Sequence, residues 1–196
     1  MLKSGITLYF VRHGETDWNA ARRLQGQTDI PLNDIGRGQA RRNGEMLRTT
    51  LAEPARFDFL ASPMKRTSET MEIVREAIGL ERSGARFDAR LREIHFGHWE
   101  GRTWLELPEV DPEEYAARER DAWRWRPRGG ESYADVSERI AGWLGTIERD
   151  AVVVSHGGVS RVLRGLVLGL VPAEIAELSV PQDKVLVLRD GQANWI

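Results

Sequence analysis

Two of the four histidines in the chain, His13 and His156, each follow directly after a segment predicted to be a β-strand. In open α/β sheets the ligand binds in the crevice beyond the carboxyl ends of the strands, so both imidazoles are expected to face one site. A single histidine at such a place is more often a hydrogen-bonded structural residue. Two histidines at equivalent places favour a functional role.

Two arginines and one glutamate define the chemistry of this site further. Arg12 precedes His13, and Arg66 lies in the first turn of a helix predicted to begin at Ser62-Pro63, again just beyond a strand. A guanidinium fork together with the free amides of a helix N-terminus is suited to hold a phosphate. Glu93 follows the third predicted strand, so a general acid or base is available at the same edge of the sheet.

The elements that must position these residues alternate along the chain. Apolar, β-favouring runs predict strands over residues 6–11, 57–61, 86–91, 151–155 and 185–188. N-cap residues and helically spaced apolar side chains predict helices that begin near residues 33, 62, 132 and 156. This alternation indicates an α/β protein, a three-layer α/β/α sandwich around a mostly parallel sheet. The length fits a single domain over residues 1–196.

Residues 103–130 differ in character from the rest of the chain. They are rich in charge, and they carry Trp104, Trp123, Trp125, Arg124, Arg126 and Arg128. We interpret this segment as a helical excursion above the sheet. Its simplest role is an insertion packed by its own aromatic side chains, because such segments more often cover a core than carry function.

Composition and charge exclude several classes of protein. The chain has no cysteine, so disulfides, zinc–thiolate sites, iron–sulfur clusters and thiol nucleophiles are excluded. With 28 Lys and Arg against 30 Asp and Glu, the net charge is −2, which disfavours nucleic acid as a partner. His95 and His98 are too few ligands for a closed metal site, so we expect no metal.

The apolar segments predict neither a leader nor a membrane anchor. The run over residues 6–11 is too short for the hydrophobic region of a signal peptide. The run over residues 159–171 contains Arg161 and Arg164 and is shorter than the roughly 20 residues that a membrane span needs, so we expect a buried helix. We therefore expect a cytoplasmic protein that does not bind membranes.

Residues 11–19 (VRHGETDWN) resemble the RHG signature of the histidine phosphatase superfamily, in its phosphoglycerate mutase-like branch. The resemblance continues in the correct order over nearly the whole chain. Its further motifs lie at residues 24–26 (LQG), 29–32 (DIPL), 36 (G), 39–40 (QA), 62–67 (SPMKRT), 91–93 (LRE), 96–101 (FGHWEG), 130–132 (GES) and 154–158 (VSHGG). A lone RHG would be weak, but this series is strongly specific.

The resemblance implies a mechanism. His13 would be the nucleophile that attacks phosphorus in line and carries a phosphohistidine intermediate. Arg12, Arg66 and His156 would hold the phosphoryl oxygens. Glu93 would protonate the leaving oxygen and later take a proton from the attacking water. The expected activity is hydrolysis of a small phosphomonoester with no metal or cofactor, and the arginines should lower the pKa of His13.

The resemblance also implies further contacts to the substrate. By position these come from Thr16, Asn19, Gln25, Gly26 and Gly157. For Thr16 and Asn19 a second interpretation is equally good, because such residues after a strand often stabilise the loop backbone.

A phosphoglycerate mutase with the same core residues is the nearest alternative. Phe96 and Trp104 stand where the mutase pattern has a tyrosine and a lysine, and Gly158 stands where it has an asparagine. The arginines of residues 103–130 differ in spacing from the paired arginines that hold its second phosphate. Without that clamp, water is the favoured acceptor, so the sequence favours a phosphatase.

Three further questions concern the substrate, a role without catalysis and the oligomeric state. The aromatic excursion resembles that of broad-specificity and α-ribazole-type phosphatases, so we expect it to cover a site for a partly apolar or sugar-containing monoester. A non-catalytic phospholigand-binding protein would typically lack the nucleophile or the acid, whereas His13 and Glu93 are both present. Exposed aromatics on a helix pair would indicate a homodimer, and the sequence leaves this open.

Overall fold

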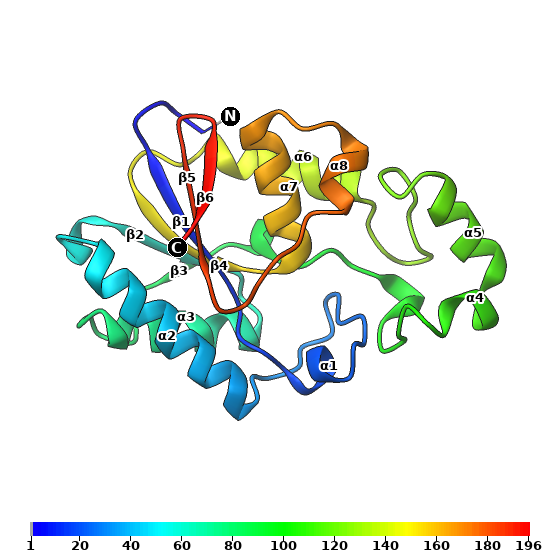
Figure 1. The fold of residues 1–196 in the computed structure, drawn as a ribbon, viewed down its shortest axis with the longest axis horizontal. Coiled ribbons are helices and arrows are strands. Elements are labelled where there is room, and N and C mark those ends of the chain that lie inside the picture. The colour runs from blue at the N-terminus through cyan, green and yellow to red at the C-terminus, as the bar shows by residue number, and fades with distance from the viewer. Residues whose placement is uncertain (1) are drawn as a thin grey trace.

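Short apolar runs form the strands of one central sheet, as the sequence predicts. In the computed structural model, which describes residues 2–196, the sheet has six strands in the order β3-β2-β4-β1-β5-β6 (Figure 1). The strands are β1 Thr7–Arg12, β2 Asp58–Ala61, β3 Arg86–Phe87, β4 Ala151–Ser155, β5 Val185–Arg189 and β6 Gln192–Trp195. The pairs β3–β2, β2–β4 and β4–β1 are parallel, whereas the pairs β1–β5 and β5–β6 are antiparallel. The prediction of a mostly parallel sheet is confirmed.

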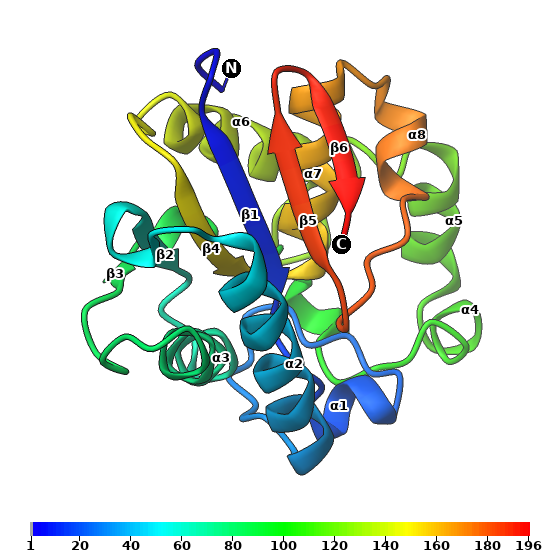
Figure 2. The same cartoon turned by 60° about the vertical axis from the view of Figure 1, so that its left-hand side comes forward.

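Helices cover both faces of the sheet and make a three-layer α/β/α sandwich (Figure 2). The helices of residues 2–196 are α1 Asp17–Ala20, α2 Asp34–Thr50, α3 Lys65–Ala77, α4 Leu107–Val110, α5 Pro112–Arg120, α6 Tyr133–Leu144, α7 Gly157–Leu168 and α8 Pro172–Ala176. The side chains of α2 and α3 share one apolar cluster with the sheet, and those of α6 and α7 share another. The predicted fold class is therefore confirmed.

Strand β4 lies in the centre of the sandwich, and its sequence reflects that place. Val152 and Val154 join the cluster beneath α2 and α3, whereas Val153 joins the cluster beneath α6 and α7. Every residue of β4 is buried. A strand of a parallel sheet that is covered on both faces needs such a continuous apolar run.

The N-caps of two helices follow the sequence prediction, and that of a third does not. Asn33 caps α2, and Ser132 forms a capping box with Asp135 at the start of α6. Helix α3 begins at Lys65 instead of at Ser62-Pro63, with Met64 as its N-cap. The backbone N–H of Ser62 donates to Val154 in the sheet, while the Asp29 carboxylate accepts from the N–H of Lys65. A distant loop thus supplies the cap, which local sequence could not reveal.

Other element boundaries also differ from the prediction. The strand expected over residues 86–91 has two residues and then a 3-10 turn, Ala89–Leu91, because the Asp88 side chain accepts from the N–H of Arg90. The helix expected over residues 159–171 ends at Leu168, where Gly169 takes φ +67°.

Strand β6 was not predicted from the sequence. It follows a tight turn at Asp190-Gly191, where both residues have positive φ. An Asp-Gly pair at such a turn is a strong hairpin signal, so the sequence did contain the information.

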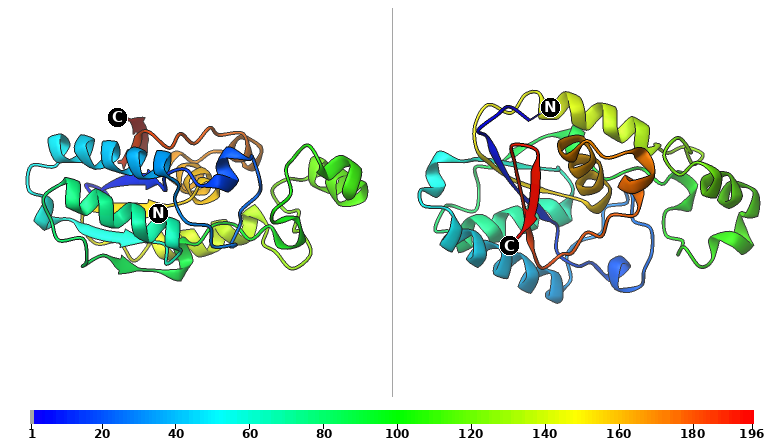
Figure 3. Two further views of the ribbon diagram at one scale, coloured as in Figure 1. Left: turned by 90° about the horizontal axis from the view of Figure 1, so that it is seen from below. Right: turned by 45° about the horizontal axis from the view of Figure 1, so that its top comes forward.

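Residues 103–130 stand beside the sandwich instead of in one of its layers (Figures 1 and 3). Helices α4 and α5 belong to this segment. Trp99, Leu24 and Leu107 form a separate buried cluster there, against which Tyr115 and Trp125 pack. The ring centroids of Trp99 and Trp125 are 4.2 Å apart. Aromatic side chains thus pack the segment, as expected, but they do so against Trp99 and Leu24, which lie outside it.

No helix within residues 2–196 combines the length and the apolar character that are needed to cross a bilayer.

The loop after β1 is held against the first turn of α2 by a close backbone approach. A Cβ atom on Gly36 would lie 2.1 Å from the carbonyl oxygen of Glu15, and one on Gly14 would lie 2.2 Å from the carbonyl oxygen of Gly36. The N–H of Asn33 also donates to the Glu15 carbonyl at 3.0 Å. This contact leaves no room for a side chain, and it fixes the loop that carries His13.

We predict that Gly36→Ala lowers the free energy of unfolding by about 1–3 kcal/mol, because overpacked atoms must move apart. Gly38→Ala is the matched control in the same helix, because its Cβ would lie 3.6 Å from the end of Arg42. Removing a helical glycine there should stabilise by about 0.5–1 kcal/mol. Denaturant unfolding measures the free energy of unfolding of both variants. Equal changes in Gly36→Ala and Gly38→Ala would contradict the argument from the close backbone approach.

Candidate active site

His13 lies at the carboxyl end of β1 with its reactive nitrogen free of a proton. Its backbone N–H continues the β1–β4 pairing by donating to Ser155 at 2.9 Å. Its Nδ1 lies 2.8 Å from the carbonyl oxygen of Gly14, and its side chain is buried. A carbonyl accepts hydrogen bonds only, so Nδ1 carries the proton and Nε2 keeps its lone pair. The residue can therefore act as a nucleophile through Nε2.

Arg66, in the first turn of α3, donates a hydrogen bond to that lone pair. Its Nε lies 3.3 Å from His13 Nε2, and its other nitrogens donate to the carbonyls of Thr28 at 2.9 Å and Gly26 at 2.8 Å. The side chain has no exposed surface. Its orientation is therefore set by the loop over residues 26–28 and not by solvent.

Two buried nitrogens at the same edge lack hydrogen-bond partners within residues 2–196. They are Arg12 Nε and His156 Nδ1. Arg12 is anchored through Nη1 to the carbonyl of Val180 at 2.6 Å, and His156 Nε2 lies 2.8 Å from Ser62 Oγ. When the Ser62 hydroxyl donates to Nε2, the His156 Nδ1 carries a proton and is a donor as well. Buried donors without partners are rare in proteins, and here they suit an anionic ligand.

The two imidazoles are held in the neutral state. Burial lowers the pKa of His13 well below 6.5, and the charges of Arg66 and Arg12 lower it further. The pKa of His156 is lowered in the same direction, again first by burial and then by Arg66. Burial therefore contributes more to the shift at His13 than the two arginines, from which the shift was predicted. Burial also lowers the pKa of Arg12 to about 10, although Glu93 nearby opposes that shift.

Glu93 is held by backbone amides at the N-terminus of α7. Its Oε1 accepts from the N–H of Ile94 at 2.9 Å and of Gly158 at 3.0 Å. A Cβ atom on Gly158 would lie 2.5 Å from that oxygen. The glycine therefore lets the carboxylate approach the helix end, where the free amides of the first turn favour it.

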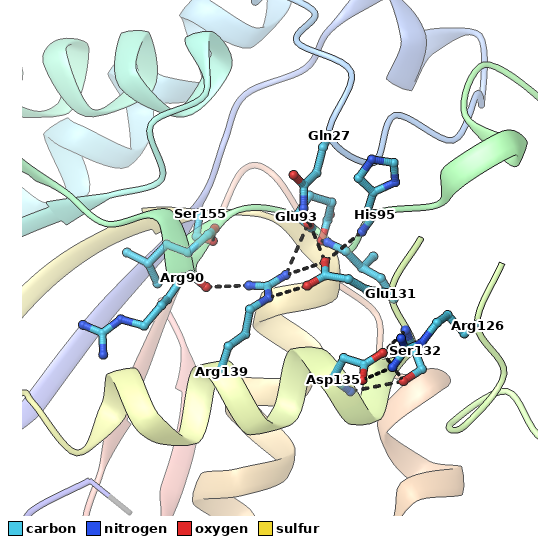
Figure 4. Close-up of polar contacts among 12 residues, drawn as sticks. Gln27, Arg90, Glu93, His95, Arg126, Glu131, Ser132, Asp135, Arg139 and Ser155 are labelled. Atoms are coloured by element: carbon cyan, nitrogen blue, oxygen red, sulfur yellow. Dashed lines mark hydrogen bonds and ion pairs between the residues drawn. The ribbon is translucent and has the colours of Figure 1, made fainter. Parts of the chain in front are cut away.

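A polar network that the sequence analysis did not identify holds the backbone of Glu93 (Figure 4). Gln27 Nε2 donates to the Glu93 carbonyl at 3.1 Å, and Arg139 on α6 reaches the same carbonyl at 3.3 Å. Arg139 also pairs with Glu131 through two nitrogens, at 3.0 and 3.1 Å. Residues 130–132 were part of the motif series, but Gln27 and Arg139 come from segments whose contact only the fold creates.

Of the five residues that were expected to make further contacts to the substrate, four line the cleft. Asn19, Gln25, Gly26 and Gly157 line the same cleft as His13. Thr16 does not line the cleft, because it is buried and forms the capping box of α1 with Asn19. Of the two interpretations of Thr16, the structure therefore supports loop stabilisation.

The cleft at this edge has a volume of about 470 Å³, a typical size for a small-molecule site. Its lining combines Arg12, His13, Arg66 and Glu93 with side chains from residues 103–130 and from α7. His156 does not line it, but its ring centroid lies 5.1 Å from that of His13. The lining residues are Arg12, His13, Asn19, Arg23, Leu24, Gln25, Gly26, Arg66, Glu93, Ile94, Phe96, Trp104, Tyr115, Arg118, Tyr133, Gly157, Gly158, Arg161, Ala176 and Glu177.

Histidines outside the cleft have structural partners. His95 Nδ1 accepts from the N–H of Gly97 at 2.8 Å, and His98 Nε2 lies 2.6 Å from Asp111. Within residues 2–196 no group of three or more His, Cys, Asp or Glu side chains is arranged to hold a metal ion.

The whole chain is similar to known proteins of one family. The sequence model of the family described as "Histidine phosphatase superfamily (branch 1)" matches residues 8–195. A glucosyl-3-phosphoglycerate phosphatase of Mycolicibacterium vanbaalenii is 36% identical, over 96% of this chain and 82% of that protein. A Salmonella paratyphi C protein named "Probable phosphoglycerate mutase GpmB" is 35% identical, over 84% of this chain and 76% of that protein. The α-ribazole phosphatase structure from Shigella flexneri superposes with a TM-score of 0.81 at 26% identity, covering 97% of this chain and 95% of that one.

The neutral histidines predict a particular pH dependence of stability. Above pH 6.5 the imidazoles are neutral in both the folded and the unfolded chain. Below it the unfolded chain takes up protons that His13 and His156 do not take up in the fold, so the free energy of unfolding falls. Over the two pH units from 7.5 to 5.5 the fall should be about 1.4 kcal/mol for each histidine, and the slope should steepen toward the acid end. Urea unfolding between pH 7.5 and 5.5 without phosphate measures it, and a wild-type slope in His156→Gln would contradict the prediction.

Proposed function

The chain belongs to the histidine phosphatase superfamily, branch 1, and we propose that it hydrolyses small phosphomonoesters through a phosphohistidine formed on His13. The relatives named phosphatases support its assignment as a phosphoric monoester hydrolase. One observation carries the choice of nucleophile. The unprotonated Nε2 of His13 lies 3.3 Å from the Nε of the buried Arg66, in the cleft that Glu93 also lines. The Arg66 Nε–H donates to this lone pair, so a phosphoryl group that enters here takes over the hydrogen bond from Arg66 and leaves the lone pair free to attack.

In the first step, His13 Nε2 attacks phosphorus and the bond to the ester oxygen breaks. The proton of the Glu93 carboxylic acid passes to that oxygen, which leaves as the alcohol. The guanidiniums of Arg12 and Arg66 and the Nδ1 of His156 stabilise the charge on the three other phosphoryl oxygens. The product is a phosphohistidine beside an ionised Glu93.

In the second step, a water molecule attacks phosphorus from the side that the alcohol has left. The Glu93 carboxylate takes a proton from this water, the bond from phosphorus to His13 breaks, and inorganic phosphate leaves. Fixed cations supply the neutralisation that magnesium ions supply in other phosphoryl transfers, so we expect no metal requirement. The chain is expected to act as one cytoplasmic domain over residues 1–196.

The mutase alternative is the lesser one. It has support from the name of the Salmonella relative. However, Phe96 and Trp104 line the cleft where the mutase pattern has a tyrosine and a lysine, and Arg124, Arg126 and Arg128 are not among its lining residues. A non-catalytic binding role is disfavoured because both His13 and Glu93 are present in the cleft.

We predict that His13→Ala abolishes phosphate release from p-nitrophenyl phosphate in the presence of EDTA, while the protein stays folded. Wild-type protein denatured with alkali during turnover, which stops hydrolysis without acid, should carry one phosphoryl group that mass spectrometry detects. His98→Gln, a histidine outside the cleft, is the matched control and should still form the phosphoenzyme. Turnover that survives in His13→Ala, or that EDTA abolishes in the wild type, would refute the scheme.

We further predict that Glu93→Gln lowers kcat/KM for an alkyl phosphate by about 10²- to 10⁴-fold, because the amide cannot protonate a poor leaving group. The amide oxygen can still accept from the N–H of Gly158, so the geometry is preserved. The loss on p-nitrophenyl phosphate should be much smaller, since p-nitrophenolate leaves without a proton. Glu177→Gln, another glutamate of the cleft, should keep the wild-type dependence on leaving group. Equal losses on both substrates would count against Glu93 as the acid.

A further inference from the structure

A second cavity lies at the opposite edge of the sheet from the active site. The catalytic residues follow the carboxyl ends of parallel strands, whereas Asp58, Arg86 and Arg149 lie at or just before the amino ends of β2, β3 and β4. The volume of this cavity is about 460 Å³, close to that of the catalytic cleft. Within residues 2–196 the two share no lining residue, so a ligand of the second cavity does not meet His13.

Arg75, in the last turn of α3, provides this cavity with a buried cation. The residue is 8% exposed, and its guanidinium lies over the ring of Phe59 at 4.7 Å. Its Nε–H is shared between the carbonyls of Glu81 at 2.8 Å and Ser83 at 3.0 Å, so the loop after α3 fixes its direction. Its two terminal nitrogens donate to no acceptor within the described part of the chain. They are therefore available to a ligand.

The positive charge of Arg75 has no counterion in the fold. No carboxylate of residues 2–196 lies within ion-pair distance of it. Burial lowers the pKa of this guanidinium, and it acts alone. Arg66, at the other end of the same helix, differs because three carboxylates oppose the effect of burial on its pKa. A charged side chain that is buried usually has a paired anion, so an anionic ligand would stabilise Arg75.

Two further arginines line the cavity and share a single carboxylate. Asp58 accepts from Arg86 through Oδ2 at 2.6 Å and from Arg149 through Oδ1 at 2.8 Å. Together with Arg75 the lining carries three positive charges and one negative charge. The cavity therefore keeps an excess of two positive charges.

A glycine gives a ligand access to the guanidinium of Arg75. A Cβ atom on Gly84 would lie 2.8 Å from Nη2 of Arg75 and 3.5 Å from its Cζ. Gly84 lines the cavity, and its φ of +103° is one that side chains other than glycine rarely adopt. A larger residue at this position would cover the nitrogens that have no acceptor.

Apolar side chains make up the rest of the wall. Phe57, Phe59 and Leu80 line the cavity beside the arginines. Phe57 and Arg149 also line a neighbouring cavity of about 610 Å³, to which Ile6 contributes. An apolar group that is joined to the anion would thus contact apolar side chains next to the cations.

From this arrangement we infer that the cavity beside Arg75 is a second binding site, which takes a small molecule with a phosphate group and an apolar ring and does not hydrolyse it. A phosphate monoester dianion matches the excess of two positive charges, and guanidinium groups suit its oxygens. The lining residues include no histidine, serine, threonine or tyrosine that could attack phosphorus. The site therefore binds such a ligand intact.

The test uses phenylphosphonate, because its bond from carbon to phosphorus is not an ester and survives the proposed reaction. It is titrated into protein labelled with nitrogen-15 and followed by NMR. The amide of Gly84 and the Nε–H of Arg75 report on the second site, and the amide of Gly157 reports on the catalytic cleft. We expect saturable shifts at both places with separate dissociation constants. Methylphosphonate and inorganic phosphate lack the ring, so each should bind the second site about tenfold more weakly.

Arg75→Met should raise the dissociation constant of the second site by about tenfold or more, because charge-assisted hydrogen bonds are lost. The constant of the catalytic cleft should not change. Arg149→Met should weaken binding by about threefold, and it remains informative if Arg75→Met folds poorly, because the Arg149 side chain is 65% exposed. The matched control is Arg82→Met, in the loop after α3, whose guanidinium pairs with two carboxylates outside the cavity. It should bind like the wild type.

Shifts confined to Gly157 when the catalytic cleft is saturated would overturn the inference, as would wild-type affinity in Arg75→Met. Equal affinities of the second site for all three probes would overturn the assignment of an organic ligand. The result is independent of the proposed function, since His13→Ala should bind phenylphosphonate at the second site as tightly as the wild type.

Discussion

The buried guanidinium of Arg66 is the constraint around which the site is organised. A charge with no exposed surface is costly to remove from water, and it is tolerated only where hydrogen-bond acceptors surround it. Here the carbonyls of Gly26 and Thr28 and the lone pair of His13 accept from it. Neutral acceptors satisfy its hydrogen bonds, and the nearby charges of Glu93, Asp29 and Glu100 oppose the effect of burial on its pKa. The same arrangement therefore keeps His13 neutral and favours an anion beside it.

The order of the strands explains how residues far apart in the sequence reach this cation. Strands β2, β4 and β1 are neighbours in the sheet and run in parallel, so their carboxyl ends lie at one edge. Arg66, His156 and His13 follow these three strands. Glu93 comes to the same edge from the loop after β3, and the amide of Gly158 at the start of α7 fixes it there. One topological feature thus brings His13, the buried arginines and Glu93 to the same edge.

The sequence predicts most of the fold because its signals there are local. The apolar run of β4, the Ser132–Asp135 capping box and the placement of His13 after a strand are visible within a few residues. Contacts between distant segments were not predictable in this way. Asp29 caps a helix that begins 36 positions later, and Gln27 meets Arg139 only across the backbone of Glu93.

The arginines that line the cleft beyond Arg12 and Arg66 were not predictable from the sequence for the same reason. Arg118 and Arg161 line the cleft, whereas Arg124, Arg126 and Arg128 do not. Spacing in the sequence does not determine the direction of a side chain within an irregular segment. For that segment only the packing of its aromatic rings could be anticipated.

The separate aromatic cluster of Trp99, Leu24 and Leu107 has an evolutionary consequence. Tyr115 and Trp125 of the segment beside the sandwich pack against this cluster, whereas Trp123 packs against the core that α6 and α7 share with the sheet. Changes in stability at distant sites without shared contacts are nearly additive. Mutations at Tyr115 or Arg118 can therefore accumulate without weakening the sheet that carries His13. Such a division allows descendants of one ancestral enzyme to acquire new substrates while they inherit the same reaction unchanged.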